Sequence, residues 1–208
     1  MILTGLAPDP HRPDYRLVEV DRGRFASLPA AALTGLDLVV GRGIGPLVFE
    51  RLQELADIEA AHRAALRAIA RRAHARFDLR RRLLQRQHPA AAVDPALDRL
   101  SAAGLLNDAQ FAADYAAQKA RRGRGPARLV RDLQAQGVER RLAEDAVRTS
   151  LAREGVDPAA AVRALAEKRA KQLAGLAPVV KKRRLVAFLM RRGFDGGEIR
   201  EVVESLNS

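Results

Sequence analysis

The sequence lacks cysteine and tryptophan altogether, and phenylalanine and tyrosine together make up only 4% of it. The absence of cysteine excludes disulfides and thiolate-ligated metal sites. The scarcity of aromatic side chains disfavours proteins that read single-stranded RNA by stacking its bases on an aromatic sheet. No run of about 18 apolar residues is present, and residues 1–10 lack the basic start and apolar run of a signal peptide. We therefore expect a cytoplasmic protein that is neither exported nor membrane-spanning.

The motifs of common enzyme and metal-binding classes are also missing. No serine stands in a Gly-x-Ser-x-Gly setting, and no P-loop lysine motif occurs. The glycine-rich segment 41–46 lacks the spacing of a dinucleotide-binding loop. The histidines are widely spaced, without an i,i+4 pair: His11, His62, His74 and His88. We therefore expect no catalytic residue, no metal site and no cofactor.

Basic residues are in excess and unevenly distributed. Lys and Arg number 37 against 25 Asp and Glu, which gives a net charge of +12. Residues 1–58 hold 6 basic and 8 acidic side chains, so the remainder of the chain carries the whole positive excess. Such a charge indicates a polyanionic partner, either nucleic acid or an anionic membrane.

The N-terminal part reads as a small module that contains β-structure. Residues 15–20 and 25–28 form two strand-like runs around a predicted turn, and residues 36–40 are apolar enough to add another strand. A glycine-rich break then precedes a helix that begins near Leu47. We assign residues 1–58 to a β-hairpin-containing module with a connecting helix.

From residue 59 onward the chain reads as amphipathic helices, and no strand is expected after residue 45. Alanine, leucine, arginine and glutamate predominate, with apolar positions every three or four residues. Helix starts are predicted at Asp94-Pro95, Asp157-Pro158, Gly125-Pro126, Asn107 with Gln110, and Asp195 with Glu198. Gly137 and Gly193 are predicted left-handed C-caps. These signals divide the region into about nine short helices.

The helices repeat in threes. Segments 83–88, 133–138 and 189–194 align as three copies of one helix end, spaced 50 and then 56 residues apart. Ten residues beyond each glycine-equivalent position stand apolar residues of a third helix: Leu97, Val147 and Val203. The predicted fold is mainly α, with three-helix repeats at residues 59–106, 107–156 and 157–208 that stack into an elongated, curved body behind the small N-terminal α+β module.

Residues 99–138 carry a recognisable pattern: Arg-Leu-Ser-Ala-Ala-Gly-Leu-Leu-Asn-Asp-Ala-Gln-Phe-Ala, then Arg-Arg-Gly-Arg-Gly-Pro-Ala-Arg-Leu-Val-Arg-Asp-Leu-Gln-Ala-Gln-Gly-Val. This pattern resembles the RecX family, as do segments 78–83 and 188–194, so the resemblance covers about residues 60 to 207. Gln87 stands where the family usually has a glycine, and Ala75 where a capping serine is common. The resemblance implies a regulator of recombination, DNA repair and the SOS response. Such a regulator binds along the groove of the RecA filament on single- or double-stranded DNA. It limits the growth, ATPase activity and strand exchange of that filament.

Basic side chains gather on the equivalent helix of each repeat, and these are the candidate filament- or DNA-binding residues. They are Arg80, Arg81 and Arg82 in the first repeat, Arg121, Arg122, Arg124, Arg128 and Arg131 in the second, and Lys181, Lys182, Arg183, Arg184, Arg191 and Arg192 in the third. Guanidinium groups form bidentate bonds to phosphates and carboxylates. The alternative is a set of charged helix surfaces that only interact with solvent. Asp108 is interpreted as a helix cap, and Leu105, Leu106, Phe111 and Tyr115 as packed core.

Three function classes remain open from the residues alone. The leading hypothesis is a non-enzymatic regulator of the recombinase filament. The alternatives are an autonomous DNA-binding or nucleoid-associated protein and a scaffold for an acidic protein partner. The absence of a clear dimerisation segment argues against a repressor that reads a palindromic site. We expect a monomer.

Overall fold

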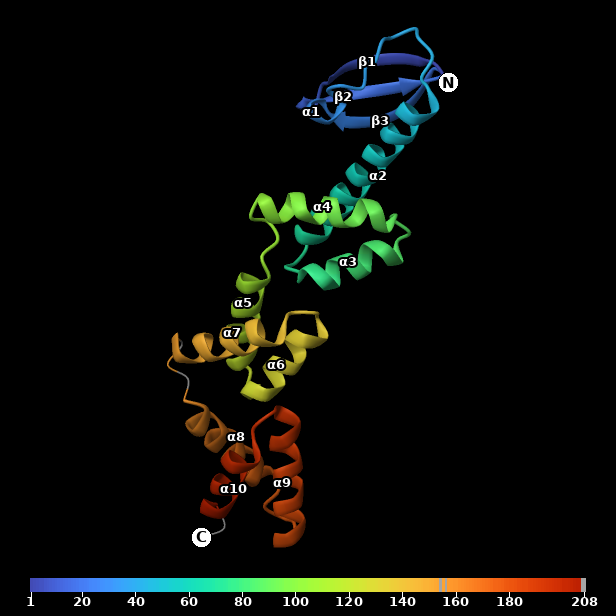
Figure 1. The fold of residues 1–208 in the computed structure, drawn as a ribbon. Helices are drawn as coiled ribbons and strands as arrows, with labels where there is room; N and C mark the ends of the chain where they lie inside the picture. Colours follow the sequence, from blue (N-terminus) through green and yellow to red (C-terminus); the bar gives the residue numbers. More distant parts are fainter. Residues whose placement is uncertain (154, 156, 207–208) are drawn as a thin grey trace. The chain divides into compact units, whose positions relative to one another are not determined.

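The computed structural model describes residues 1–153, 155 and 157–206 (Figure 1). Its elements are β1 (Leu3–Asp9), β2 (Arg12–Val20), β3 (Gly23–Pro29), α1 (Ala30–Leu33), α2 (Pro46–Ile69), α3 (Arg76–Gln85), α4 (Ala90–Ala102), α5 (Asp108–Ala120), α6 (Pro126–Ala135), α7 (Arg140–Arg153), α8 (Pro158–Gln172), α9 (Pro178–Arg192) and α10 (Gly196–Ser205). They form two compact units, one of Met1–Arg72 and Leu79–Leu106, the other of Ala73–Asp78 and Asn107–Ser208. The predicted mainly helical fold with a small β-containing module is confirmed.

The N-terminal module is an antiparallel sheet in the order β1-β2-β3. The central strand β2 places Val18 opposite Ala26 of β3 and Leu6 of β1. Val18 is fully buried and packs with Leu3 of β1, Leu28 of β3 and the first turns of α2. The predicted β2–β3 hairpin is therefore confirmed, and one sheet face supplies the core of this module.

The predicted strand over residues 36–40 is wrong. Positive φ angles at Gly35, Asp37 and Gly41 turn this stretch repeatedly, so it is not an extended strand. The edge strand is β1 instead, whose glycine and proline give it a weak strand signal in isolation. Main-chain bonds from the Leu3 N–H to the Arg42 carbonyl and from the Gly41 N–H to the Leu3 carbonyl tie the loop to β1.

Helix α2 begins at Pro46, close to the predicted start, and serves two hydrophobic cores. Leu52 and Leu55 in its first half pack on the sheet, whereas Ala64 and Ala65 in its second half pack on α3 and α4. The proposed division between residues 58 and 59 falls inside this helix, between the two sets of buried residues.

The three repeats end their second helix in the same way. Gln87, Gly137 and Gly193 follow α3, α6 and α9 with φ angles of 63°, 83° and 88°. One residue later, an N–H donates to the carbonyl five residues back in all three copies, which is the Schellman arrangement: His88 to Leu83, Val138 to Leu133 and Phe194 to Leu189. Gln87 therefore adopts the left-handed conformation expected of the family's glycine. The predicted third-helix residues Leu97, Val147 and Val203 are all buried.

Most predicted helix starts are confirmed. The side chains of Asn107 and Asp157 accept backbone N–H bonds at the starts of α5 and α8, and Asp195 with Glu198 forms a complete capping box on α10. Gly125 precedes α6 as expected. The Gln110 side chain donates to Asp114, so Asn107 caps α5 without a reciprocal bond.

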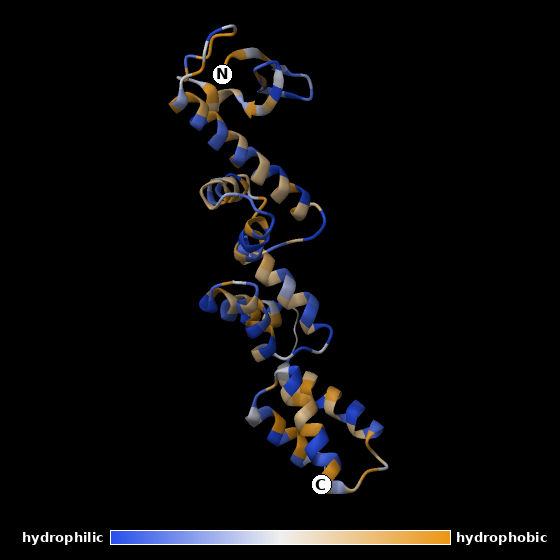
Figure 2. Cartoon of the chain, turned by 90° about the vertical axis from the view of Figure 1, so that its right-hand side faces the viewer, coloured by the Kyte–Doolittle hydropathy of each residue, from blue (hydrophilic) through white to orange (hydrophobic). Residues whose placement is uncertain are grey.

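The predicted start at Asp94-Pro95 is wrong, because α4 begins at Ala90 and contains Pro95. The carbonyl of Pro89 accepts the N–H groups of Ala92 and Val93, so the helix is already established before Pro95. The expected burial of Leu105 is also wrong, since this side chain is 52% exposed while the adjacent Leu106 is buried. Figure 2 shows hydrophilic and hydrophobic residues alternating along the helices, as amphipathic packing requires.

None of the helices in the described part of the chain is both long and apolar enough to cross a membrane. No group of three or more His, Cys, Asp or Glu side chains among these residues is arranged to hold a metal ion.

Candidate functional site

Repeats two and three meet at a close contact between two glycines. The N–H of Gly125, just before α6, donates to the carbonyl of Arg192 at the end of α9 over 2.8 Å. A Cβ on Gly125 would lie 2.5 Å from the Gly193 carbonyl oxygen, and a Cβ on Gly193 would overlap the Cβ of Arg128. Only glycine allows this approach. The contact therefore sets the arginine-bearing ends of α6 and α9 next to each other.

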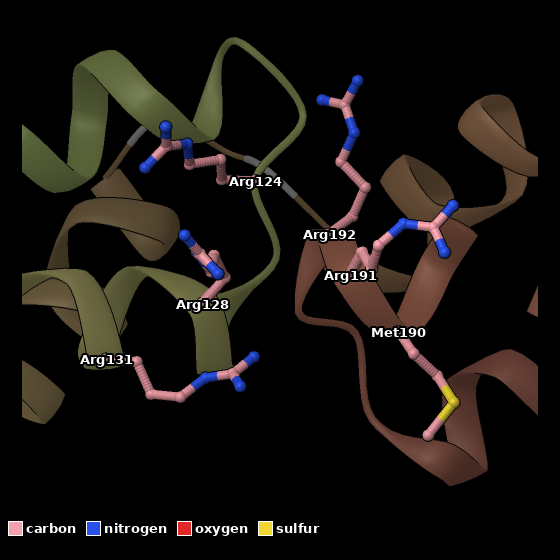
Figure 3. Close-up of a pocket in the computed structure, with 6 residues that line it drawn as sticks. All are labelled: Arg124, Arg128, Arg131, Met190, Arg191 and Arg192. Atoms are coloured by element: carbon pink, nitrogen blue, oxygen red, sulfur yellow. The ribbon is translucent and has the colours of Figure 1, made fainter. Parts of the chain in front are cut away.

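Between these two ends lies a hollow of about 680 Å³, hereafter the arginine hollow (Figure 3). Its lining residues are Arg124, Arg128 and Arg131 on one side and Met190, Arg191 and Arg192 on the other. None of these described lining residues is acidic. The structure thus brings together five of the predicted binding residues from two repeats, although the two sets are about 60 residues apart in sequence.

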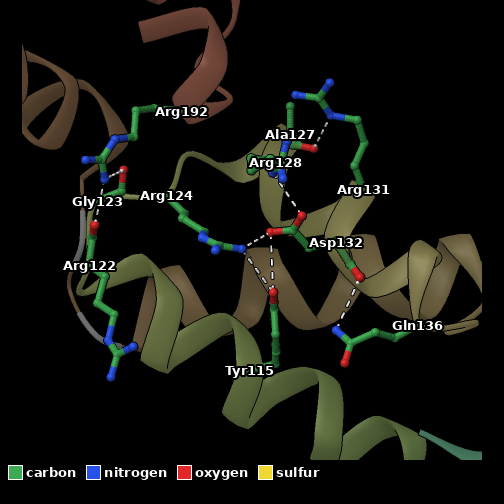
Figure 4. Close-up of polar contacts among 10 residues, drawn as sticks. All are labelled: Tyr115, Arg122, Gly123, Arg124, Ala127, Arg128, Arg131, Asp132, Gln136 and Arg192. Carbon is green, nitrogen blue, oxygen red and sulfur yellow. Dashed lines mark hydrogen bonds and ion pairs between the residues drawn. The ribbon is translucent and has the colours of Figure 1, made fainter. Parts of the chain in front are cut away.

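A half-buried carboxylate behind the hollow orients two of its arginines (Figure 4). Asp132 forms ion pairs with Arg124 and, at 2.9 Å, with Arg128. The Tyr115 hydroxyl donates to Asp132 over 3.3 Å and accepts from Arg124 over 3.1 Å. Burial first, and then the Asp132 charge, raise the pKa of Tyr115, so its hydroxyl remains a donor. These contacts fix the orientation of Arg124 and Arg128 within the protein itself.

The contact between repeats two and three, hereafter the junction, also orients Arg192. Its Nη1 donates to the carbonyl oxygen of Arg122 over 3.0 Å, and its guanidinium lies 5.2 Å from the centre of the Phe188 ring. Arg131 donates to the carbonyl of Ala127, and its side chain is exposed. With one carboxylate for five guanidinium groups, the hollow retains a strong positive potential.

The remaining predicted residues of repeats two and three lie elsewhere. Arg121 and Arg122, at the end of α5, line a separate groove between α5 and α7. Lys181, Lys182, Arg183 and Arg184 occupy the first two turns of α9, at the opposite end from the hollow. Arg184 and Arg191 share one face of α9, since seven residues turn a helix by nearly two full revolutions. The structure therefore separates residues that the sequence places in one basic cluster.

Among the basic residues of repeat one, Arg80 forms an ion pair within its own repeat. Nε and Nη2 of Arg80 bond both carboxylate oxygens of Asp94 on α4, over 2.9 and 3.1 Å. This bond raises the pKa of Arg80. Arg80 thus connects two helices of its own repeat, while Arg81 is exposed and Arg82 half-buried. A continuous basic track over all three repeats stays a prediction.

Sequence reasoning missed Asp132, Met190 and the polar role of Tyr115. The Arg128–Asp132 spacing of four residues was a usable signal for a helical ion pair. Asp108 caps a helix, as predicted, but a different one: it accepts the N–H of Arg76 at the start of α3 over 2.7 Å. Nothing in the local pattern indicates that bond.

A second polar cluster, also missed, lies inside the N-terminal unit. The Glu59 side chain of α2 is 1% exposed and accepts bonds from Arg12 of β2 over 2.8 Å and Arg99 of α4 over 3.1 Å. The Tyr15 hydroxyl bridges Glu59 and Arg99. Nδ1 of His62 is buried next to this cluster and has no hydrogen-bond partner among the residues that the structure describes. Burial first, and then the Arg99 charge, lower the pKa of His62. The cluster connects the sheet to α2 and α4, and it is called the Glu59 joint below.

Three family models match the chain, each described as a three-helix domain of RecX. The first domain matches residues 61–100, the second 107–147 and the third 156–203. Each of these segments covers one group of three consecutive helices. The agreement includes the repeat order along the chain.

Characterised relatives and solved structures agree with these matches. A regulatory protein RecX from Halorhodospira halophila is 36% identical over 144 residues, which cover 68% of this chain and 85% of the relative. One from Mycobacterium marinum is 39% identical over 153 residues, covering 70% and 83%. A crystal structure of regulatory protein RecX superposes with a TM-score of 0.76 over 98% of both chains at 16% identity. RecX from Lactobacillus salivarius gives a TM-score of 0.61 over 73% of this chain and 97% of that structure at 21% identity.

Proposed function

The chain belongs to the RecX family of regulatory proteins, and we propose that it binds the RecA–DNA filament through the arginine hollow and restrains filament growth, ATP hydrolysis and strand exchange. In this proposal it acts as a cytoplasmic monomer in recombination and DNA repair. Sedimentation velocity would test the monomeric state.

The observation that supports this proposal is the convergence of five guanidinium groups at the arginine hollow. Arginine stays protonated in proteins, so it does not serve as a general acid or base near neutral pH. Its fork of N–H donors instead recognises carboxylate and phosphate oxygens. A surface of this kind binds an anionic partner, and both a filament's DNA backbone and acidic side chains of its subunits offer such groups.

Restraint of the filament requires unequal binding to its states. A ligand that binds active and inactive filaments with the same affinity shifts neither population. The proposed mechanism is therefore preferential binding to an inactive or capped arrangement of neighbouring subunits. Contacts from two repeats, held at one junction, suit a site that spans such neighbours.

The direct experiment measures RecA-dependent ATP hydrolysis and strand exchange with and without this protein. We expect both rates to fall as the protein saturates the filament. Unchanged rates at saturating binding would contradict the proposal.

A charge-matched pair of variants tests the hollow. Arg128, Arg131 and Arg191 are replaced by alanine in one variant; in its control the exposed Arg141, Arg163 and Arg200, outside the hollow, are replaced. Both lose three positive charges. The hollow variant should bind the filament more weakly and with a flatter salt dependence than the control, because specific anion contacts release counterions. Equal affinities and equal salt slopes would assign the hollow to solubility alone.

One observation favours autonomous DNA binding as a second candidate function. Lys181, Lys182, Arg183 and Arg184 stand in the first two turns of α9, where the helix dipole disfavours cations, and no acidic residue stands in its first turn. A DNA phosphate near this end would relieve that repulsion. Affinity for duplex and single-stranded DNA without recombinase, measured for wild type and for the quadruple alanine variant, tests this candidate. Equal DNA affinity of the two proteins would remove it.

A further inference from the structure

An apolar groove lies on the surface of repeat two, on another side of α6 from the arginine hollow. It has a volume of about 470 Å³. Its apolar lining comes from Pro126, Ala127 and Val130 on α6 and from Val147, Leu151 and Ala152 on α7. Glu144 and Arg148, at its edges, are paired with residues of their own helix. The groove floor is therefore apolar and its charged rim already neutralised.

The equivalent position in repeat one is bridged by an ion pair. With the 50-residue spacing, Val130 corresponds to Arg80 and Glu144 to Asp94. In repeat one these two residues bond each other across α3 and α4 through two hydrogen bonds. In repeat two, valine replaces the arginine, and Glu144 bonds Arg140 instead. The position that an ion pair bridges in repeat one is therefore part of the apolar groove in repeat two.

The groove and the arginine hollow lie on adjoining sides of α6. At 100° per residue, Val130, Ala127, Arg131 and Arg128 follow one another around the helix axis. Ala127 lines the groove and Arg131, one turn later, lines the hollow. The hollow itself contains an apolar side chain, since Met190 is 59% exposed within it. The exposed side of α6 therefore presents an apolar strip beside a cationic strip.

This combination discriminates between anionic ligands. A phosphate backbone has no apolar group to fill the groove. Single-stranded bases stack on aromatic rings or on guanidinium planes, and the groove offers neither, because its lining is aliphatic apart from the ion-paired Glu144 and Arg148. A peptide with carboxylates and an aliphatic side chain matches both strips, because guanidinium groups bind carboxylates in bidentate fashion and aliphatic side chains gain free energy on burial.

We propose that this surface of α6 binds an acidic peptide segment of a protein partner, with an aliphatic side chain of that segment in the α6–α7 groove and its carboxylates on the arginines of the hollow. The inference rests on the proposed function, in which the partner is the protein component of the filament, and it assigns the hollow to protein in preference to DNA.

Photo-methionine provides a near-isosteric probe of the partner. The chain has two methionines, Met1 and Met190, so full replacement places one photoreactive group in the hollow. A Met190→Leu protein, labelled only at Met1, is the control. Irradiated on the recombinase–DNA filament, the labelled protein should cross-link through Met190 to a recombinase peptide that contains Asp or Glu together with Leu, Ile or Val. A cross-link confined to DNA, to a second copy of this chain or to a peptide without acidic residues would overturn the inference.

A valine pair tests the groove. Val130→Asn places an amide in the groove, whereas Val179→Asn makes the same change at an 81% exposed position on α9. Val130→Asn should lower filament affinity about tenfold, the order of effect of losing one aliphatic contact, without changing the salt slope. Val179→Asn should bind as wild type. Ala152→Glu, on the exposed rim, should also weaken binding by repelling carboxylates while keeping the thermal unfolding of wild type.

The outcomes separate this inference from the proposed function. If the protein neither binds nor inhibits the filament, both fail. If it inhibits the filament but Val130→Asn and Ala152→Glu bind as wild type, only the acidic-peptide assignment fails. The acidic-peptide assignment is supported if Ala152→Glu folds as wild type but loses binding, and if the expected cross-link forms.

Discussion

Replacing Gly193 by alanine tests the junction that forms the arginine hollow. Two separate effects oppose a side chain at this position. The residue has a φ of 88°, a left-handed conformation that costs alanine about 1 kcal/mol relative to glycine. The new methyl group would also overlap the backbone and Cβ of Arg128. Relief of that overlap requires α6 and the end of α9 to move apart.

The size of the effect follows from the contacts that this movement breaks. Separation of the two ends loses the 2.8 Å bond from the Gly125 N–H to the Arg192 carbonyl and the bond from Arg192 to the Arg122 carbonyl. Loss of one buried hydrogen bond, together with the accompanying repacking, should lower the free energy that holds the two ends together by about 2–4 kcal/mol. Gly35→Ala is the matched control, because Gly35 has a φ of 85° and an added Cβ there meets no atom within 4 Å.

Amide hydrogen exchange measures the junction directly. We expect protection of the Gly125 amide to fall about 30- to 1,000-fold in Gly193→Ala, which is the exchange equivalent of 2–4 kcal/mol, and to stay unchanged in Gly35→Ala. Filament binding should weaken in Gly193→Ala although all five arginines are retained. Wild-type protection at Gly125, with an unfolding cost no greater than that of Gly35→Ala, would refute the steric argument.

Three further predictions concern the folded units. Leu133→Ala, at a fully buried position, should lower the free energy of unfolding by about 2–5 kcal/mol in urea titrations, and a loss below about 1 kcal/mol would contradict its place in the core. Glu59→Gln should destabilise the N-terminal unit by about 1–3 kcal/mol, because Arg12 and Arg99 lose the charge they share; an unchanged melting temperature would show that the joint contributes nothing. The N-terminal unit should lose stability as pH falls below the ordinary histidine pKa of 6.5, because the unfolded state then binds a proton that burial keeps off His62. His62→Leu should flatten this dependence between about pH 7.5 and about pH 5.5, and an equal slope in wild type and variant would exclude His62 as its source.

Local signals in the sequence predicted the repeat architecture well. A left-handed helix end, a capping side chain and the burial of every third or fourth residue depend on a few neighbouring residues, so they can be read from the chain itself. The equivalent conformations at Gln87, Gly137 and Gly193 confirm that alignment, even where glycine is replaced. The same reasoning correctly placed Asn107 and Asp195 as caps.

Errors arose where a local signal competes with a distant partner. Asp94-Pro95 resembles a helix start, yet Asp94 bonds Arg80 and the helix begins earlier. Residues 36–40 resemble a strand, but β1 takes the free sheet edge beside β2. The missed joint around Glu59 connects residues 47 and 40 positions away along the chain. No window of local sequence contains such pairs.

Helix periodicity, capping and net charge are enough to predict a basic, mainly helical chain of three related repeats, because they are properties of neighbouring residues and of composition. Which arginines act together was decided only by tertiary structure. The approach of Gly125 to Gly193 brings Arg128 and Arg191 to one hollow, whereas Asp94 engages Arg80 within repeat one. Identical residue types therefore differ in role because their partners come from distant segments, and packing between helices selects those partners.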